Sequence, residues 1–192
     1  MLILIVMSTI SLNAQSLFQS KLKAEIGFNR SNLLPIMLET EKINGGIGWN
    51  GGISYSLEAE RFFLETGLGY RSLNFLISEN LSETQKFTAK ANSISIPFLV
   101  GTNFIKNDRN IAPILKTGVR LDFTTGLNGE RTDILDVEDI EGFNATYELN
   151  VGAKFNRFEL MFTYNTDLNK YIKTISEKNK YVGLKLAYRI LN

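Results

Sequence analysis

Ionisable residues recur at alternate positions along this chain, and they are the side chains best suited to chemistry. Ten of them form a predicted charge network on one face of the chain: Glu65, Arg71, Lys116, Arg120, Asp122, Glu148, Lys154, Glu159, Lys185 and Arg189. Lys23 and Glu25 belong to the same face. Charges of both signs that are removed from water should pair, because an unpaired buried charge is costly. We therefore expect a structural network of ion pairs. The alternatives are a proton or ion path, or a small binding cleft.

The chain lacks the residues on which most hydrolytic and metal chemistry depends. It contains no His and no Cys. Without His a Ser–His or Asp–His arrangement cannot form, and without imidazole or thiolate the usual transition-metal ligands are missing. Gly67 and Gly69 form a GxG pair, but no helix is expected after them, so a nucleotide site is not indicated. We expect no catalytic residues, no cofactor and no metal site, and we predict that the chain is not an enzyme.

One acidic run stands apart from the alternating face. Its members are Asp133, Asp136, Glu138, Asp139 and Glu141. The simplest interpretation is a solvated loop. A weak Ca²⁺ or Mg²⁺ bridge to lipopolysaccharide is the alternative, although the spacing is not that of an EF-hand loop. Paired carboxylates could also act as acid and base on a lipid or glycan, which would make the chain an enzyme after all.

The segments that must position these residues alternate between apolar and polar side chains. Eight such segments are present, at 22–29, 47–57, 62–72, 92–104, 111–123, 143–155, 158–164 and 182–190. In the last one, Val182, Leu184 and Leu186 share one face, while Lys185 and Arg189 share the other. This period of two predicts strands with one face toward lipid and one toward a polar interior. The fold class predicted is an all-β, eight-stranded, antiparallel up-and-down transmembrane β-barrel.

The connections between these segments alternate in length, which predicts topology. Long connections are expected at 31–45, 74–90, 125–142 and 167–180, and short turns at 58–61, 106–110 and 156–157. Outer-membrane barrels place long loops outside the cell and short turns in the periplasm. With eight strands, both termini are then periplasmic. Within the fourth segment, Pro97 cannot donate a ladder hydrogen bond, so we expect a bulge or an edge-like irregularity there.

Aromatic residues fall near both ends of the apolar faces. Those near the long connections are Trp49, Tyr70, Phe123, Phe143, Tyr147 and Tyr164; those near the short turns are Phe62, Phe104, Phe155, Phe158 and Tyr188. Two such girdles are typical of the two membrane interfaces. The competing interpretation is a soluble β-sandwich or lipocalin-like barrel whose core these rings would fill.

The N-terminus and the overall composition agree with an envelope protein. Residues 1–15, MLILIVMSTISLNAQ, resemble a secretory signal with a short apolar core and a small-residue exit, leaving 16–192 as the barrel domain. No basic residue precedes the core, so the natural start lies upstream of Met1 or the signal is atypical. The alternative is a buried first strand or helix. A net charge of +1 gives no electrostatic case for nucleic acid.

Four segments resemble the small outer-membrane β-barrel proteins of Bacteroidetes, the PorT-like family. They are the NAQ signal end, the hairpin GGISYSLEAERFFLETGLGY, the strand SISIPFLVGTNF and the ending YVGLKLAYRILN. The ending is also similar to the signal read by the barrel-assembly machinery, through Tyr181, Gly183, Leu186 and Tyr188, although Asn192 replaces the usual terminal aromatic residue. The resemblance implies an outer-membrane barrel, and for some members a role in type IX secretion.

The function expected from these observations is non-enzymatic. A structural or partner-binding role in the cell envelope, through long extracellular loops, fits an interior filled by side chains. The alternatives are a narrow, porin-like transport pore and an accessory barrel of a secretion system. The expected partners are outer-membrane lipid and lipopolysaccharide, the barrel-assembly machinery during biogenesis, and an envelope protein.

Overall fold

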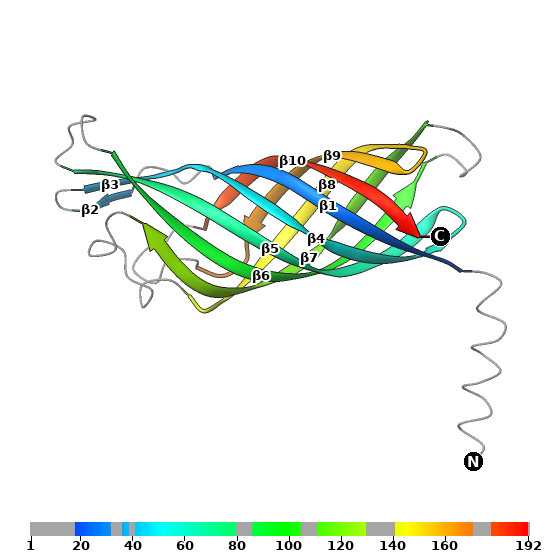
Figure 1. The fold of residues 1–192 in the computed structure, drawn as a ribbon, viewed down its shortest axis with the longest axis horizontal. Coiled ribbons are helices and arrows are strands. Elements are labelled where there is room, and N and C mark those ends of the chain that lie inside the picture. Colours follow the sequence, from blue (N-terminus) through cyan, green and yellow to red (C-terminus); the bar gives the residue numbers. More distant parts are fainter. Residues whose placement is uncertain are drawn as a thin grey trace, which may run out of the picture.

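The computed structural model describes residues 18–31, 36–38, 41–79, 86–104, 111–129, 141–170 and 178–191. Within these ranges the chain forms ten strands: β1 Gln19–Ser31, β2 Ile36–Leu38, β3 Glu41–Gly45, β4 Ile47–Ala59, β5 Phe62–Glu79, β6 Lys86–Asn103, β7 Ile111–Gly129, β8 Phe143–Phe155, β9 Phe158–Asp167 and β10 Lys180–Leu191 (Figure 1). In this part of the chain, no helix is long and apolar enough to cross a membrane.

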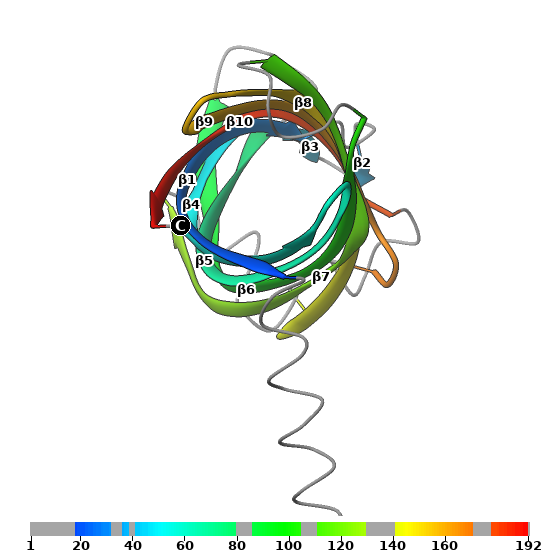
Figure 2. The same ribbon diagram turned by 90° about the vertical axis from the view of Figure 1, so that its right-hand side faces the viewer.

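Eight of these strands close into a barrel. Every neighbouring pair is antiparallel, in the order β5-β4-β1-β10-β9-β8-β7-β6, and a further pairing between β5 and β6 closes the ring (Figure 2). The first and last strands of the chain meet in a long ladder, with Ile26 opposite Leu186. Closure removes every free edge around this part of the sheet. The predicted eight-stranded antiparallel barrel is confirmed.

The two faces of the wall differ as the alternation predicted. On β10, Leu184 is 57% exposed whereas the next residue, Lys185, is 7% exposed. Apolar side chains such as Ile26, Leu68 and Phe162 also point outward and are exposed. Polar side chains therefore occupy the interior and apolar ones cover the exterior, the reverse of a soluble barrel and the arrangement expected in lipid.

Two tight turns join the strands at one end of the barrel. One lies at Glu60 and Arg61, between β4 and β5, and the other at Asn156 and Arg157, between β8 and β9. Glu60 and Asn156 adopt positive φ angles of 47° and 53°. Asn tolerates this left-handed region better than most residues, because its short polar side chain can bond locally. The end of β10 lies at the same end of the barrel as these turns (Figure 1). The turn predicted at 106–110 lies outside the described residues.

The long connections are shorter than predicted, because strands extend into them. β5 continues to Glu79 and β6 already begins at Lys86, so most of the predicted 74–90 loop is strand. β7 likewise continues to Gly129 within the predicted 125–142 loop. Outward residues here, such as Asn74 and Lys90, are polar, so the sequence loses its apolar alternation while the backbone still pairs. Residues 80–85, 130–140 and 171–177 of the predicted loops lie outside the described residues.

A small hairpin was also missed in the predicted 31–45 connection. There β2 pairs with β3, and β3 pairs with β5. Gly45 lies opposite Phe75, while Trp49 lies opposite Ser72, so β3 takes over from β4 as the neighbour of β5. At this end the sheet order is β2-β3-β5-β6-β7, and these strands extend farther along the barrel axis than the rest of the wall, toward the left in Figure 1. We call this part the tall sheet.

The irregularity expected at Pro97 takes a particular form. Between β5 and β6 the pairing runs to Thr66 and Phe98, stops, and resumes at Gly69 and Ser95 in unchanged register. Pro97 therefore interrupts the ladder without a bulge, because it lacks the N–H that the ladder needs. The bulge lies elsewhere, between β6 and β7. Asn92 pairs with Gly126 and Ser93 with Thr124, which leaves Thr125 as the extra residue.

Aromatic side chains contact one another at two levels of the outer wall. Toward the tall sheet, Trp49 packs on Tyr70 and Phe123 on Phe143, both with ring centres 5.4 Å apart. Toward the tight turns, Phe158 packs on Tyr188 at 5.0 Å. The sequence placed the rings toward the tall sheet near strand ends. This is confirmed for Phe143, which begins β8, and for Trp49, near the start of β4, but not for Tyr70, because β5 continues to Glu79.

Candidate functional site

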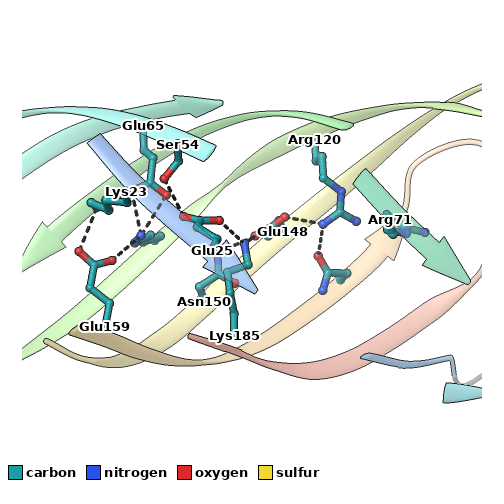
Figure 3. A network of polar contacts seen from close by, with 12 residues as sticks. Lys23, Glu25, Ser54, Glu65, Arg71, Arg120, Glu148, Asn150, Glu159 and Lys185 are labelled. Atoms are coloured by element: carbon teal, nitrogen blue, oxygen red, sulfur yellow. Dashed lines mark hydrogen bonds and ion pairs between the residues drawn. The ribbon is translucent and has the colours of Figure 1, made fainter. Parts of the chain in front are cut away.

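The predicted charge network lies inside the barrel. Eight of its ten members are almost fully buried, namely Glu65, Arg71, Lys116, Arg120, Asp122, Glu148, Glu159 and Lys185. Lys154 and Arg189 are partly exposed near the tight turns. All ten point inward, because buried and exposed side chains alternate along each strand and these ten occupy the inward positions. The network runs along the length of the interior (Figure 3).

A four-membered cluster of alternating charge fills the lumen on the side of the tight turns. The Lys23 ammonium lies 2.7 Å from Glu65 and 2.9 Å from Glu159, and the Lys116 ammonium lies 2.9 Å and 2.8 Å from the same two carboxylates. The ring of Phe63 lies beside both cations, with its centre 5.4 Å from Lys23 Nζ and 5.7 Å from Lys116 Nζ. Four strands are tied together at this point: β1, β5, β7 and β9.

Nearer the turns a second cluster joins Lys21, Glu58 and Lys154. Lys21 and Glu58 form a close ion pair, and Lys154 Nζ lies 3.8 Å from the same Glu58 carboxylate. Arg189 donates to the backbone oxygen of Asn156 at 3.2 Å. Lys21 and Glu58 were not predicted as members, because the segments were ended one residue too early. Continuing the alternation by one position at each end would have found both.

At the centre, Lys185 lies between two carboxylates. Its ammonium is 2.9 Å from Glu148 and 3.5 Å from Glu25. The other oxygen of Glu148 accepts a hydrogen bond from Arg120 at 2.7 Å. Glu25 also accepts one from the Ser54 hydroxyl at 2.7 Å. Glu148 therefore connects Lys185 to the arginines farther along the lumen.

Toward the tall sheet, two arginines share Asp122 and Tyr181. Arg71 Nη1 lies 2.8 Å from one Asp122 oxygen, and Arg120 Nε lies 3.1 Å from the other. Both guanidinium groups donate to the Tyr181 hydroxyl, which donates in turn to Thr146 at 3.3 Å. Arg71 also stacks on the Tyr181 ring, with its Cζ 4.4 Å from the ring centre. The sequence indicated Tyr181 only as part of an assembly signal, although it lies on the inward face of β10.

Not every polar atom in this layer has a partner. Arg71 Nε and Nη2, Asn150 Oδ1 and Asp167 Oδ2 are buried without a hydrogen bond. A polar cavity of about 30 Å³ adjoins Arg71, Arg120 and Glu148. Roughly 10–15 Å³ is enough for one water, so the cavity can hold about two. Buried water is the ordinary partner of such atoms.

Apolar side chains share the interior with the charges. Toward the turns these are Phe63, Leu99, Ala112, Ile114, Met161 and Ala187; on the inner face of the tall sheet they are Leu73, Phe75, Ala89, Ala91 and Leu127. On the turn side the apolar and charged side chains are interleaved, since Leu99 lies opposite Glu65 and Ala187 lies opposite Glu159. Among the described residues, no group of three or more metal-binding side chains is arranged to hold a metal ion. Of the acidic run only Glu141 is described, and its backbone oxygen accepts a bond from Thr124 at 2.9 Å; Asp133, Asp136, Glu138 and Asp139 lie outside the described residues.

Solved outer-membrane proteins have a fold similar to this barrel. In shape the barrel is similar to the outer membrane protein OprG from Pseudomonas aeruginosa, with a TM-score of 0.51 and 10% identity, over 90% of this chain and 97% of that one. It also matches Neisserial surface protein A with a TM-score of 0.47 and 10% identity, over 90% and 99% of the two chains. No curated protein sequence matches the chain.

The likeness to OprG concerns the fold alone, and it agrees with the closed antiparallel barrel described above. The family model for the outer membrane protein beta-barrel domain matches residues 13–173. That match spans more than half of the chain and includes most of the lumen residues. An outer-membrane location follows from the family and from the apolar exterior. The chain belongs to the outer membrane protein beta-barrel domain family.

Proposed function

We propose that this protein is a non-enzymatic outer-membrane barrel whose tall sheet and long loops bind a partner in the cell envelope. The observation that carries the proposal is the difference between its two halves. The membrane-spanning half is filled by paired charges, whereas the other half extends three strands well beyond the aromatic level. The membrane-spanning half is a rigid support, and the tall sheet provides the surface on which a partner can bind.

The filled interior supports a role outside the lumen. Lys23, Glu65, Lys116 and Glu159 each lie within 3 Å of two opposite charges, and their side chains are at most 6% exposed. Moving a solute through this layer would require breaking several buried ion pairs at once, and removing a buried partner costs about 3–5 kcal/mol. An eight-stranded barrel is also just wide enough for its own side chains.

The tall sheet supports a role in binding. Its outward positions include Asn74, Thr88 and Lys90, which are polar and lie beyond the apolar band. The ladder between β7 and β8 ends at Phe123 and Phe143, and Thr124 N–H still donates to Gly142 O at 2.9 Å; beyond Thr124, no described strand pairs with this edge of β7. A strand edge with free backbone groups can pair with an added strand of another chain. The sheet therefore offers both a polar face and an edge to a partner.

The same reasoning extends to topology and processing. We infer that the tall sheet faces outside, that both termini are periplasmic, and that residues 1–15 are removed as a signal. The alternation of long and short connections supports the first two inferences, and the apolar core of the leader supports the third. A more specific form of this proposal is that the protein is one of the PorT-like barrels of Bacteroidetes and has an accessory role in secretion.

A narrow pore is the second candidate, and one observation favours it. The cavity beside Arg71, Arg120 and Glu148 contains unpaired buried polar atoms, so part of the lumen can be wet. A conducting path would need this water to continue past the cluster at Lys116. Planar-bilayer recording distinguishes the candidates. A steady, ion-selective conductance that changes in Arg120→Gln or Glu148→Gln would establish the pore, and a silent bilayer with correctly folded protein would exclude it.

The binding proposal is tested by crosslinking in cells. A photo-crosslinking residue at Lys90, on the outward face of the tall sheet, should capture one envelope protein in stoichiometric yield. The matched control at Leu160, on the lipid-facing wall, should capture none. Deleting residues 128–140 should abolish the Lys90 product while the barrel still folds. Equal capture at both positions, or capture that survives the deletion, would refute the proposal.

A further inference from the structure

A shallow apolar groove lies on the outer wall where β9, β10, β1 and β4 are neighbouring strands. Its volume is about 470 Å³, and it is lined by Phe28, Asn29, Arg30, Ile47, Phe162, Val182, Gly183 and Leu184. Most of this lining is apolar and exposed. One member, Arg30, is a cation that points outward from the barrel.

The groove spans two successive rows of outward side chains. In one row Tyr164, Val182, Arg30 and Ile47 lie opposite one another across the four strands; in the next row toward the turns, Phe162, Leu184, Phe28 and Trp49 do the same. Four adjacent strands are separated by three spacings of about 4.8 Å, so the groove is roughly 14 Å wide. That width exceeds one acyl chain and suits several chains side by side.

A second cation stands at the same end of the groove. Arg30 pairs with Val182, and Lys180 is the next outward residue along β10, so Lys180 lies diagonally across from Arg30. Such diagonal positions are about 7–8 Å apart, within reach of two long side chains that hold one anion. Both residues are exposed.

No carboxylate faces these two cations from the described part of the wall. The outward residues of β1, β4, β9 and β10 include no Asp or Glu, and Arg30 and Lys180 are the charges among them. Arg30 is the next outward residue after Phe28, the partner of Trp49, and Lys180 is the first residue of β10. Trp is typical of the level at which the headgroup region begins. Unneutralised cations at that depth attract anionic headgroups.

We propose that this groove binds a phosphorylated, multiply acylated glycolipid of the lipid A type. Arg30 and Lys180 hold its phosphate, since a guanidinium group can bind phosphate through two parallel hydrogen bonds. Its acyl chains lie along Phe28, Phe162 and Leu184. The assignment to the outer leaflet rests on the topology given under the proposed function, whereas the phosphate and acyl-chain chemistry does not.

The proposal is tested with the purified full-length barrel in detergent, by native mass spectrometry with lipid A as the probe. The double variant Arg30→Gln, Lys180→Gln should lose affinity about 30-fold at low salt, because each cation near a membrane surface contributes roughly fivefold. Arg157→Gln is the matched control, since Arg157 is an exposed cation in the tight turn between β8 and β9, at the other end of the barrel from Arg30 and Lys180. It should bind as the wild type does. Equal affinity in the double variant and the wild type would overturn the proposal.

Two further comparisons test the two parts of the ligand. Dephosphorylated lipid A should bind wild type and double variant equally weakly. Val182→Trp keeps both cations but fills the groove, and it should weaken lipid A while leaving phosphatidylglycerol unchanged. Equal affinity of the wild type for phosphatidylglycerol and lipid A would overturn the assignment to a multiply acylated lipid. Because these measurements need neither loops nor an envelope partner, their failure is distinguishable from failure of the proposed function.

Discussion

Arg120 on β7 and Glu148 on β8 are joined by a hydrogen bond of 2.7 Å, and this contact connects the central group of Glu25, Lys185 and Glu148 to the arginine group at Asp122 and Tyr181. On one side of it, Glu148 binds Lys185. On the other side, Arg120 binds Asp122 and Tyr181. The contact therefore couples the charged layers that would otherwise be separate, and the barrel should be sensitive to its loss.

Replacing Glu148 with Gln should destabilise the barrel strongly. The change keeps the shape of the side chain but leaves Arg120 and Lys185 without their shared carboxylate. Breaking a buried ion pair from one side costs about 3–5 kcal/mol. Because Arg120 keeps Asp122 and Lys185 keeps Glu25, we expect a loss at the lower end of that range. Urea unfolding in lipid vesicles measures this change. Glu60→Gln, at the exposed turn, is the control and should be within about 0.5 kcal/mol of the wild type. If the Glu148→Gln barrel were as stable as the wild type, the network would contribute no stability.

Charge should be tolerated very differently on the two faces of the wall. Leu184→Arg places a cation toward lipid and should cost roughly 2–4 kcal/mol if it lies near the midplane of the bilayer. Thr163→Ser, on the inward face, keeps the hydroxyl and should change stability little. The same unfolding titration compares them. Similar losses in both variants would contradict the assignment of faces.

The sequence predicted which side chains of each strand point into the barrel, but it did not predict where each strand ends. Glu65, Arg120 and Lys185 could be assigned to the interior from the alternation of apolar and polar residues, because the face of each strand toward lipid must be apolar. Beyond Tyr70 most outward residues are polar, so a paired strand such as β5 up to Glu79 resembles a loop in composition. Pairing between backbones, which composition does not record, decides its conformation there.

The membership of the site shows the same limit. Lys21, Glu58 and Tyr181 belong to the network but lie just outside the predicted segments, and continuing the alternation by one residue would have included them. Which charges pair was beyond the sequence, because it depends on register between strands. Lys116 on β7 reaches Glu159 on β9 across an intervening strand, at 2.8 Å, only because both side chains point into a narrow lumen.

Close approach between strands should make one inward glycine difficult to replace. A Cβ added to Gly118 would lie 2.1 Å from the backbone oxygen of Phe98, which cannot move without disturbing the ladder. Gly118→Ala should therefore destabilise by about 1–3 kcal/mol, as overpacking does. Gly51→Ala is the control, because its nearest neighbour would lie at 3.4 Å. Refolding yield and unfolding midpoints check both. Equal tolerance at the two positions would contradict the strand spacing described here.

The turn between β8 and β9 should depend on a left-handed residue. Asn156 has a φ of 53°. A β-branched residue is strained in that region, by roughly 1–2 kcal/mol, so Asn156→Val should slow refolding and lower stability. Asn156→Gly should be neutral or slightly stabilising, since Gly adopts positive φ without strain. If Val were tolerated as well as Gly, the turn would not have the conformation described.

Topology can be tested at two exposed positions that the structure describes at opposite ends of the barrel. Asn128 lies near the end of β7 in the tall sheet, and Arg157 lies in the tight turn after β8. The natural chain has no Cys, so a single introduced thiol reports one site only. On intact cells a membrane-impermeant maleimide should label Asn128→Cys and leave Arg157→Cys unlabelled, because long loops face outward in this class of barrel. Permeabilising the outer membrane should then expose Arg157→Cys, which controls for reactivity of that position. Labelling of Arg157→Cys alone on intact cells would invert the barrel. It would place the tall sheet in the periplasm, so that any partner would have to be sought there and not at the cell surface.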